Sequence, residues 1–146
     1  MSKIIIKNLN DLTKLIELRI KKALQMTQNE IWETINSHIE KYYNEYTPIL
    51  YERTYTFAKK LIKTEIVKNG NSLSCKVGID PDYLSFGYKE TMGADVVNWA
   101  NNHSHGGIYN SNFGCFWDDA MQELGLEKGI LDIMRRNLRE CGVSVK

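Results

Sequence analysis

The chain has 146 residues, of which 42% are hydrophobic and 25% charged, and its formal net charge is +1. This composition predicts one globular domain, and the near-neutral charge excludes a bulk field that would attract nucleic acid or an anionic membrane. Three widely spaced cysteines, an N-terminal MSKIIIKNLNDL unlike a signal peptide, and no apolar run of about 20 residues predict synthesis in the cytoplasm and no membrane contact.

A long amphipathic helix is predicted in the N-terminal third of the chain. Asn10 or Asp11 is a suitable N-cap, and neither Pro nor Gly occurs from Leu12 to about Tyr43. Pro48 ends the helix because it lacks an N–H and disfavours helical backbone before it. At about 1.5 Å per residue this helix is long for so small a domain, so we expect part of it to pack outside the fold. Its apolar positions follow helical spacing: Leu12, Ile16, Ile20, Ala23, Leu24, Ile31, Ile35, Ile39 and Tyr42.

A β-hairpin is predicted over residues 57–80. Residues 58–68 alternate in polarity and are rich in β-branched side chains, which favours a strand. Asn69-Gly70 is a typical hairpin turn, since both residues tolerate positive φ. The second strand alternates clearly, with one face formed by Leu73, Cys75, Val77 and Ile79.

The sequence then predicts a long irregular loop over residues 82–114, where Gly, Asn, Ser and His accumulate and where Asp95–Ala100 favours a short helix. Loops of this length in compact domains are usually functional or disordered.

Residues 115–146 predict the C-terminal helices. One helix extends from Trp117 to Leu124 and is stopped by Gly125, and the last extends from Glu127 to Glu140. A short strand is expected over Val143–Val145. The inward positions of the last helix are predicted to be Ile130, Leu131, Met134 and Leu138.

The order of these elements predicts the fold class. A long N-terminal helix within residues 1–46, a hairpin, a loop and C-terminal helices indicate an α+β fold, with the helices packed on a small antiparallel sheet. We expect residues 1–146 to form a single domain.

His103-Ser104-His105 is the first candidate for chemistry. In a loop, the two histidines can converge on one metal, with Cys115 or Asp118 completing a tetrahedral site, as in a metal-dependent hydrolase. No HxxxH or CxxC pattern supports the metal. Cys115 with a histidine base is a candidate nucleophile, but the aromatic residues around it indicate a buried thiol. We therefore expect no catalytic residue, no metal, no cofactor and no enzymatic activity.

The acidic residues Asp118, Asp119 and Glu123 are a second candidate cluster. Consecutive residues on a helix point about 100° apart, so adjacent aspartates share a site poorly. We interpret them as favourable charge at the start of the helix.

A nucleic-acid-binding module is a further alternative. Basic and aromatic residues combine in single-strand binders, and here Glu45, Glu52 and Glu65 interrupt such a patch. The patch would comprise Lys59, Lys60, Lys63, Lys68, Tyr51, Tyr55 and Phe57.

The connector and the hairpin resemble a family of phage morphogenesis proteins. The connector contains Tyr46-Thr47-Pro48 followed by Tyr51-Glu52-Arg53-Thr54, and the hairpin ends with Lys76-Val77-Gly78-Ile79. Trp99–Gly107 is similar to the family's aromatic-acidic-glycine stretch, and Leu138–Gly142 to its usual close. These are the minor tail-component or tail-completion proteins of long-tailed bacteriophages, which act at the head–tail joint. The chain lacks the glycine that the family pattern has after Thr54.

The resemblance implies a structural protein of the virion. It implies a homo-oligomeric ring, typically a hexamer, that links the connector or adaptor to the tail tube as a neck, tail-completion or tail-terminator protein. DNA would be only cargo passing through the channel. A sheet would line the ring, helices would lie outside, and the long loop would contact neighbouring rings or line the channel.

The stretch YYNEYTPILYERTY, residues 42–55, holds five of the eight tyrosines. Tyr42 continues the apolar face of the helix, which predicts a core position. Beyond Pro48, alternate residues of an extended chain would lie on one side, and Tyr and Arg are frequent anchors of protein interfaces. Together with residues of the loop, the predicted subunit interface comprises Tyr46, Tyr51, Arg53, Tyr55, His103, His105 and Tyr109.

Overall fold

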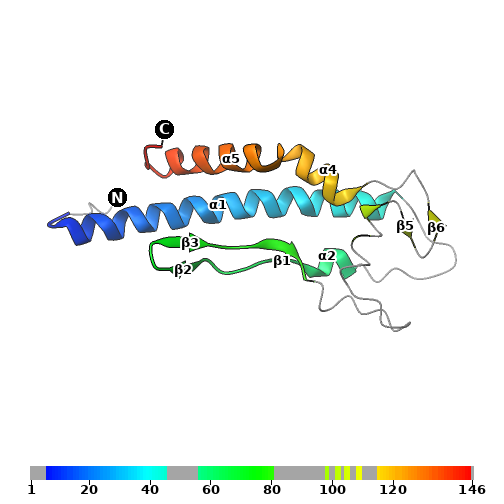
Figure 1. The fold of residues 1–146 in the computed structure, drawn as a ribbon, viewed down its shortest axis with the longest axis horizontal. Helices are drawn as coiled ribbons and strands as arrows, with labels where there is room; N and C mark the ends of the chain where they lie inside the picture. Colours follow the sequence, from blue (N-terminus) through cyan, green and yellow to red (C-terminus); the bar gives the residue numbers. More distant parts are fainter. Residues whose placement is uncertain are drawn as a thin grey trace.

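The computed structural model describes residues 6–45, 56–80, 98, 101–102, 104–105, 108–109 and 115–145, with the backbone alone at 56–57, 104–105 and 108–109. The long helix α1 (Leu9–Asn44) is the middle layer. The helices α4 (Phe116–Glu123) and α5 (Leu126–Glu140) lie along one side of it, and a β-hairpin lies along another (Figure 1). The predicted α+β fold is confirmed.

The helix α1 confirms the predicted long helix and begins slightly earlier than expected. The side chain of Asn8 accepts a hydrogen bond from the Asp11 backbone N at 2.9 Å, so Asn8 is the N-cap in place of the expected Asn10 or Asp11. The helix has 36 residues, a length of about 54 Å at 1.5 Å per residue. It is therefore much longer than the 15-residue α5 that packs against it.

The hairpin is built from four short strands that follow the short helix α2 (Thr56–Lys60). They are β1 (Leu61–Lys63), β2 (Val67–Asn69), β3 (Ser72–Ser74) and β4 (Val77–Ile79). Strand β1 pairs antiparallel with β4, Leu61 opposite Ile79, and β2 pairs with β3, Val67 opposite Ser74. The expected hairpin is thus present. Its first residues are helical, however, so the expectation of a strand from residue 58 is wrong over 58–60.

The turn of the hairpin lies one residue later than predicted. Asn69 is the last residue of β2 and pairs with Ser72, so the turn residues are Gly70 and Asn71. Gly70 has φ +60°, a conformation that glycine adopts without a steric penalty. The positive φ that the Asn-Gly pair predicted is therefore at the glycine alone.

A buried glutamine of α1 holds the hairpin where its two ladders meet. Gln28 is 2% exposed, and its Nε2 donates to the carbonyl oxygens of Thr64 at 2.8 Å and Lys76 at 3.1 Å. Trp32 Nε1 adds a bond to the Leu61 carbonyl at 3.2 Å. Buried polar groups need such partners, so these bonds fix where the hairpin docks on α1.

The core lies where α1, α4 and the base of the hairpin meet. Tyr42 and Phe116 contact one another there, with ring centroids 5.5 Å apart, and the core position predicted for Tyr42 is confirmed. Partly buried side chains from α2 and β4 surround this cluster. Its buried members are Ile35, Ile39, Tyr42, Leu61, Phe116 and Ala120.

The two C-terminal helices meet at a glycine-rich corner. Gly125 has φ +75° and ends α4, as predicted. A Cβ at Gly129 would lie 1.9 Å from the Leu124 carbonyl oxygen, so the first turn of α5 approaches the end of α4 too closely for any side chain there. The expectation that Leu131 faces inward is wrong, because it is 55% exposed. The strand expected over Val143–Val145 is not formed.

The region expected to be a loop contains a short antiparallel ladder. Strand β5 (Ser104–His105) pairs with β6 (Ile108–Tyr109). The two residues between these strands are glycines, which suit a two-residue hairpin connection. The backbone N of Asn102 donates to the Asn98 carbonyl at 3.0 Å, one turn of helix near the predicted position.

Candidate functional site

The residues predicted to form the subunit interface are only partly placed. Tyr46, Tyr51, Arg53, Tyr55 and His103 lie outside the described residues. For the other two, the backbone pairing is known: His105 is opposite Ile108, and Tyr109 is opposite Ser104. The assignment of these seven residues to an interface stays a prediction.

Cys115, the candidate metal ligand and nucleophile, is half-buried at the start of α4. Burial raises the pKa of its thiol, and the nearby Asp119 and Asp118 raise that pKa further. An activated cysteine has a lowered pKa, so this environment opposes a thiolate nucleophile. Within the described residues, no three His, Cys, Asp or Glu side chains gather closely enough to hold a metal ion. His103 and the side chain of His105 lie outside that set.

The two aspartates of α4 have the place that the sequence predicted. Asp118 and Asp119 lie in its first turn, where negative charge favours the helix dipole. Glu123 is at the other end of α4, and its Oε2 lies 2.7 Å from His38 Nε2. The side chain of the N-cap residue, Cys115, makes no capping hydrogen bond to the helix. Instead, Asn101 Oδ1 accepts from the backbone N of Trp117 at 3.0 Å and of Asp118 at 3.2 Å. Local sequence does not reveal this cap, because Asn101 lies sixteen residues before Trp117.

Two lysines of the candidate nucleic-acid patch make contacts inside the protein. Lys63 Nζ donates to Asn29 Oδ1 at 2.8 Å and lies 5.1 Å from the centroid of the Trp32 ring. Lys68 Nζ forms an ion pair with Glu17 at 2.5 Å. Both contacts join the hairpin to α1. Both lysines therefore stabilise the packing of the hairpin on α1, a role that requires no nucleic acid.

A buried polar group joins α5 to the middle of α1. Asn137 is 3% exposed, and its Nδ2 donates to Thr27 Oγ1 at 3.0 Å. The Thr27 hydroxyl donates to the Ala23 carbonyl one turn earlier at 2.9 Å. The sequence pattern did not identify Asn137, since polar residues are rarely buried without a partner that only the fold supplies.

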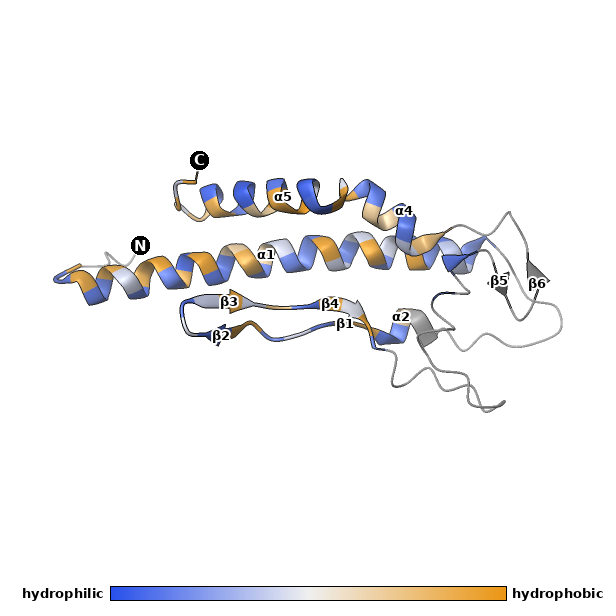
Figure 2. Cartoon of the chain, viewed as in Figure 1, coloured by the Kyte–Doolittle hydropathy of each residue, from blue (hydrophilic) through white to orange (hydrophobic). Residues whose placement is uncertain are grey.

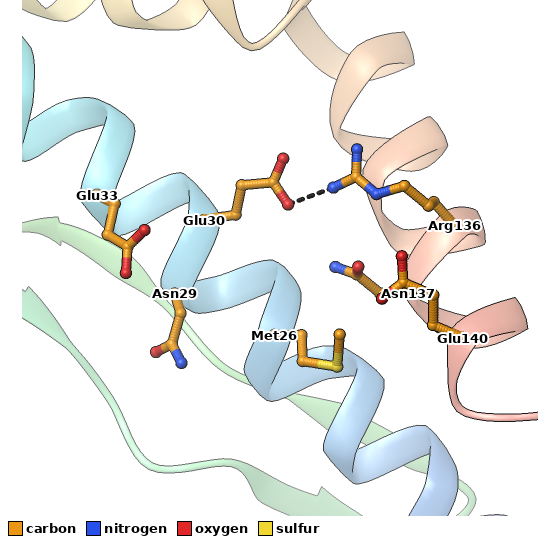
Figure 3. A pocket seen from close by; sticks show the side chains of 7 residues that line it. All are labelled: Met26, Asn29, Glu30, Glu33, Arg136, Asn137 and Glu140. Carbon is orange, nitrogen blue, oxygen red and sulfur yellow. Dashed lines mark hydrogen bonds and ion pairs between the residues drawn. The ribbon is translucent and has the colours of Figure 1, made fainter.

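An open cleft lies beside this contact, between α1 and α5 (Figure 3). Its volume is about 430 Å³, and an ion pair between Glu30 and Arg136 crosses it. The hydrogen bond to Glu30, and then the charge of that carboxylate, raise the pKa of Arg136 above its usual value. The cleft is lined by Met26, Asn29, Glu30, Glu33, Arg136, Asn137 and Glu140.

Exposed aliphatic side chains gather at the N-terminal end of α1. This end extends beyond the end of α5 and the turn of the hairpin (Figure 1), and hydrophobic positions recur along it (Figure 2). The most exposed is Leu9, at 78%. On the rest of the described surface the large exposed hydrophobic residues are more scattered, in β1, β2 and α5. The group at this end comprises Ile6, Leu9, Leu12, Ile16 and Leu18.

No helix in the described part of the chain is both long enough and apolar enough to cross a bilayer.

Fold and surface together define an α+β protein organised on one long helix with an uncovered aliphatic end. The YomN family model matches residues 8–140, which is most of the chain, so the protein belongs to the YomN family. No match was found among curated proteins, and none was found among solved structures. The family name describes no activity.

Proposed function

We propose that the chain is a structural subunit of a phage-type particle. Copies of it form a closed ring, a hexamer in the family that the sequence resembles, at the joint between head and tail. The ring links the connector or adaptor to the tail tube, and DNA passes through its channel as cargo. The protein is synthesised in the host cytoplasm and functions in the virion.

The observation that carries the proposal is the uncovered end of α1. A helix of 36 residues extends beyond the elements that pack on it, and its free end bears aliphatic side chains exposed by 37% to 78%. Large exposed apolar groups that cluster on a small protein mark contacts with other proteins. A subunit of an assembly would bury such a surface against a neighbouring protein.

Two further observations support the proposal. The element order, with a long helix, a hairpin and two C-terminal helices, is the order expected from the resemblance to head–tail joining proteins. The net charge of +1 also suits an assembly of many identical copies, because strongly charged copies would repel one another.

The test is assembly of the purified full-length protein. Its mass in solution would be measured by light scattering after size exclusion, alone and with connector and tail-tube proteins, and the products would be imaged by negative stain. The proposal expects rings that bind the end of a connector or a tail tube. A protein that stays monomeric and binds neither partner contradicts it.

A further inference from the structure

We infer that the first two turns of α1 are a contact between copies of this chain. The contact surface is the α1 strip, which we define as Leu9, Leu12 and Ile16. The inference rests on the proposed function in one respect, because it assumes that the protein assembles. The α1 strip is separate from the interface that was predicted for the tyrosine-rich stretch of residues 42–55.

The α1 strip continues a face that the protein itself buries further along the helix. The residues at positions 9, 12, 16, 20, 23 and 27 follow one another at spacings of three and four, so they share a face. Ala23 and Thr27 on that face are buried, and Thr27 contacts α5. The part of this face that α5 covers ends near Arg19, whose Nη1 donates to the Gly142 carbonyl just after α5. Within the described residues, no element covers the α1 strip.

The charges around the α1 strip indicate what packs on it. Over residues 9–16 the two charged side chains are Asp11 and Lys14, and at 100° per residue both lie more than 120° from the centre of the strip. The positions that flank the strip hold Thr13 and Leu15, which are uncharged. A surface selected for a basic or acidic partner would have flanking charges of the opposite sign. A surface that packs against itself must avoid like charges, and the nearest charged residue beyond the strip on this side of the helix, Arg19, donates to the Gly142 carbonyl of its own chain.

The spacing of the α1 strip also fits self-packing. Leu9, Leu12 and Ile16 stand at the three-then-four spacing of a coiled-coil seam, in which apolar residues of one helix pack between those of an identical helix. Because both copies would use the same strip, this contact is isologous and pairs copies about a two-fold axis, separately from the heterologous contacts that close a ring. Two turns of helix are small beside the roughly 800 Å² per partner of a standard interface, so the strip is one part of the contact between subunits.

The experiment compares two variants of the full-length protein. The test variant carries Leu9→Gln and Leu12→Gln, which remove apolar surface from the α1 strip without adding charge. The control is Leu18→Gln, the same change at an exposed leucine of the same helix, about 150° from the centre of the strip. Glutamine and leucine have similar helix propensities, and Leu9 and Leu18 are mostly exposed, so folding is retained. Circular dichroism melts check this for each protein.

Sedimentation velocity from micromolar to millimolar concentration gives the readout. We expect wild type and Leu18→Gln to self-associate alike, and the test variant to show an apparent dissociation constant at least about tenfold higher. Equal self-association of all three proteins overturns the inference and leaves the ring proposal standing. A strictly monomeric wild type over the whole range also overturns it. In that case, binding to connector or tail-tube proteins decides separately whether the proposed function survives.

Discussion

The hydrogen bonds between Gln28 and the hairpin allow the effect of a mutation on the free energy of unfolding to be estimated. Gln28→Met keeps the length of the side chain and removes both donors. The Lys76 carbonyl keeps its bond from the Thr64 backbone N at 2.9 Å. The Thr64 carbonyl has no other donor among the described residues, and the bond that Gln28 Oε1 accepts from Gln25 Nε2 at 3.2 Å is lost as well.

The expected cost follows from the loss of three hydrogen bonds, two that Gln28 donates and one that it accepts. At about 0.5–1.5 kcal/mol each, they contribute roughly 1.5–4.5 kcal/mol. Burial of the more apolar methionine offsets roughly 1 kcal/mol of this. We therefore expect Gln28→Met to lower the free energy of unfolding by about 1–3 kcal/mol. In a chain of this size that lowers the melting temperature by roughly 5 °C.

Urea denaturation followed by circular dichroism measures the change. The matched control is Gln122→Met on the exposed surface of α4, which should stay within about 0.5 kcal/mol of wild type. Gln28→Glu should cost more than Gln28→Met, because it adds a buried charge to the loss of both donors. If Gln28→Met unfolds at the same urea concentration as the control, the docking of the hairpin does not depend on Gln28 and the reasoning fails.

Three further predictions concern other parts of the molecule. Gly129→Ala should destabilise the protein by about 1–3 kcal/mol in urea, despite the better helix propensity of alanine, because its Cβ would lie 1.9 Å from the Leu124 carbonyl oxygen. In a variant whose other two cysteines are serine, alkylation of Cys115 should reach half its maximal rate at a higher pH than that of a free cysteine in the same assay, since a raised pKa leaves less thiolate at any given pH. Tyr51→Ala and Arg53→Ala should weaken assembly at least about tenfold in light scattering while the monomer melts as wild type does.

Each of these predictions has a clear contrary outcome. Gly78→Ala is the control for the glycine change, since a Cβ there meets nothing within 4 Å, and equal stability of the two variants would contradict the close approach at Gly129. Half-maximal alkylation of Cys115 at the same pH as a free cysteine, or at a lower one, would contradict the effect of burial on its pKa. Melting of the isolated subunit by Tyr51→Ala would place that residue in the core and remove it from the predicted interface.

The sequence predicted the elements of the fold better than the contacts between them. The periodicity of α1, the turn at Gly70 and the stop at Gly125 are local signals, since each depends on a few neighbouring residues. Gln28 and Asn137 escaped prediction for the opposite reason. Each is a polar residue buried by partners that lie more than 30 residues away in the chain. A single sequence does not reveal such partners.

The error at Leu131 has a related cause. Its position on the helical pattern suits the inner face of α5, but the residues of α5 that contact Thr27 of α1 are Met134 and Asn137. At 100° per residue Leu131 lies about 120° around the helix from Asn137, and it is left exposed. Likewise the aliphatic residues at the start of α1 had the pattern of a core face, and only the structure distinguishes the covered part of that face from the α1 strip.

The most direct test of the central claim is imaging of particles that contain this protein in labelled form. Purified phage-type particles carrying a tagged copy would be marked with a gold-coupled antibody and examined by negative-stain microscopy. The account predicts one label site per particle, at the joint between head and tail, and a ring at that position. Label that is absent from intact particles, or that lies along the tail or on the head, would contradict it.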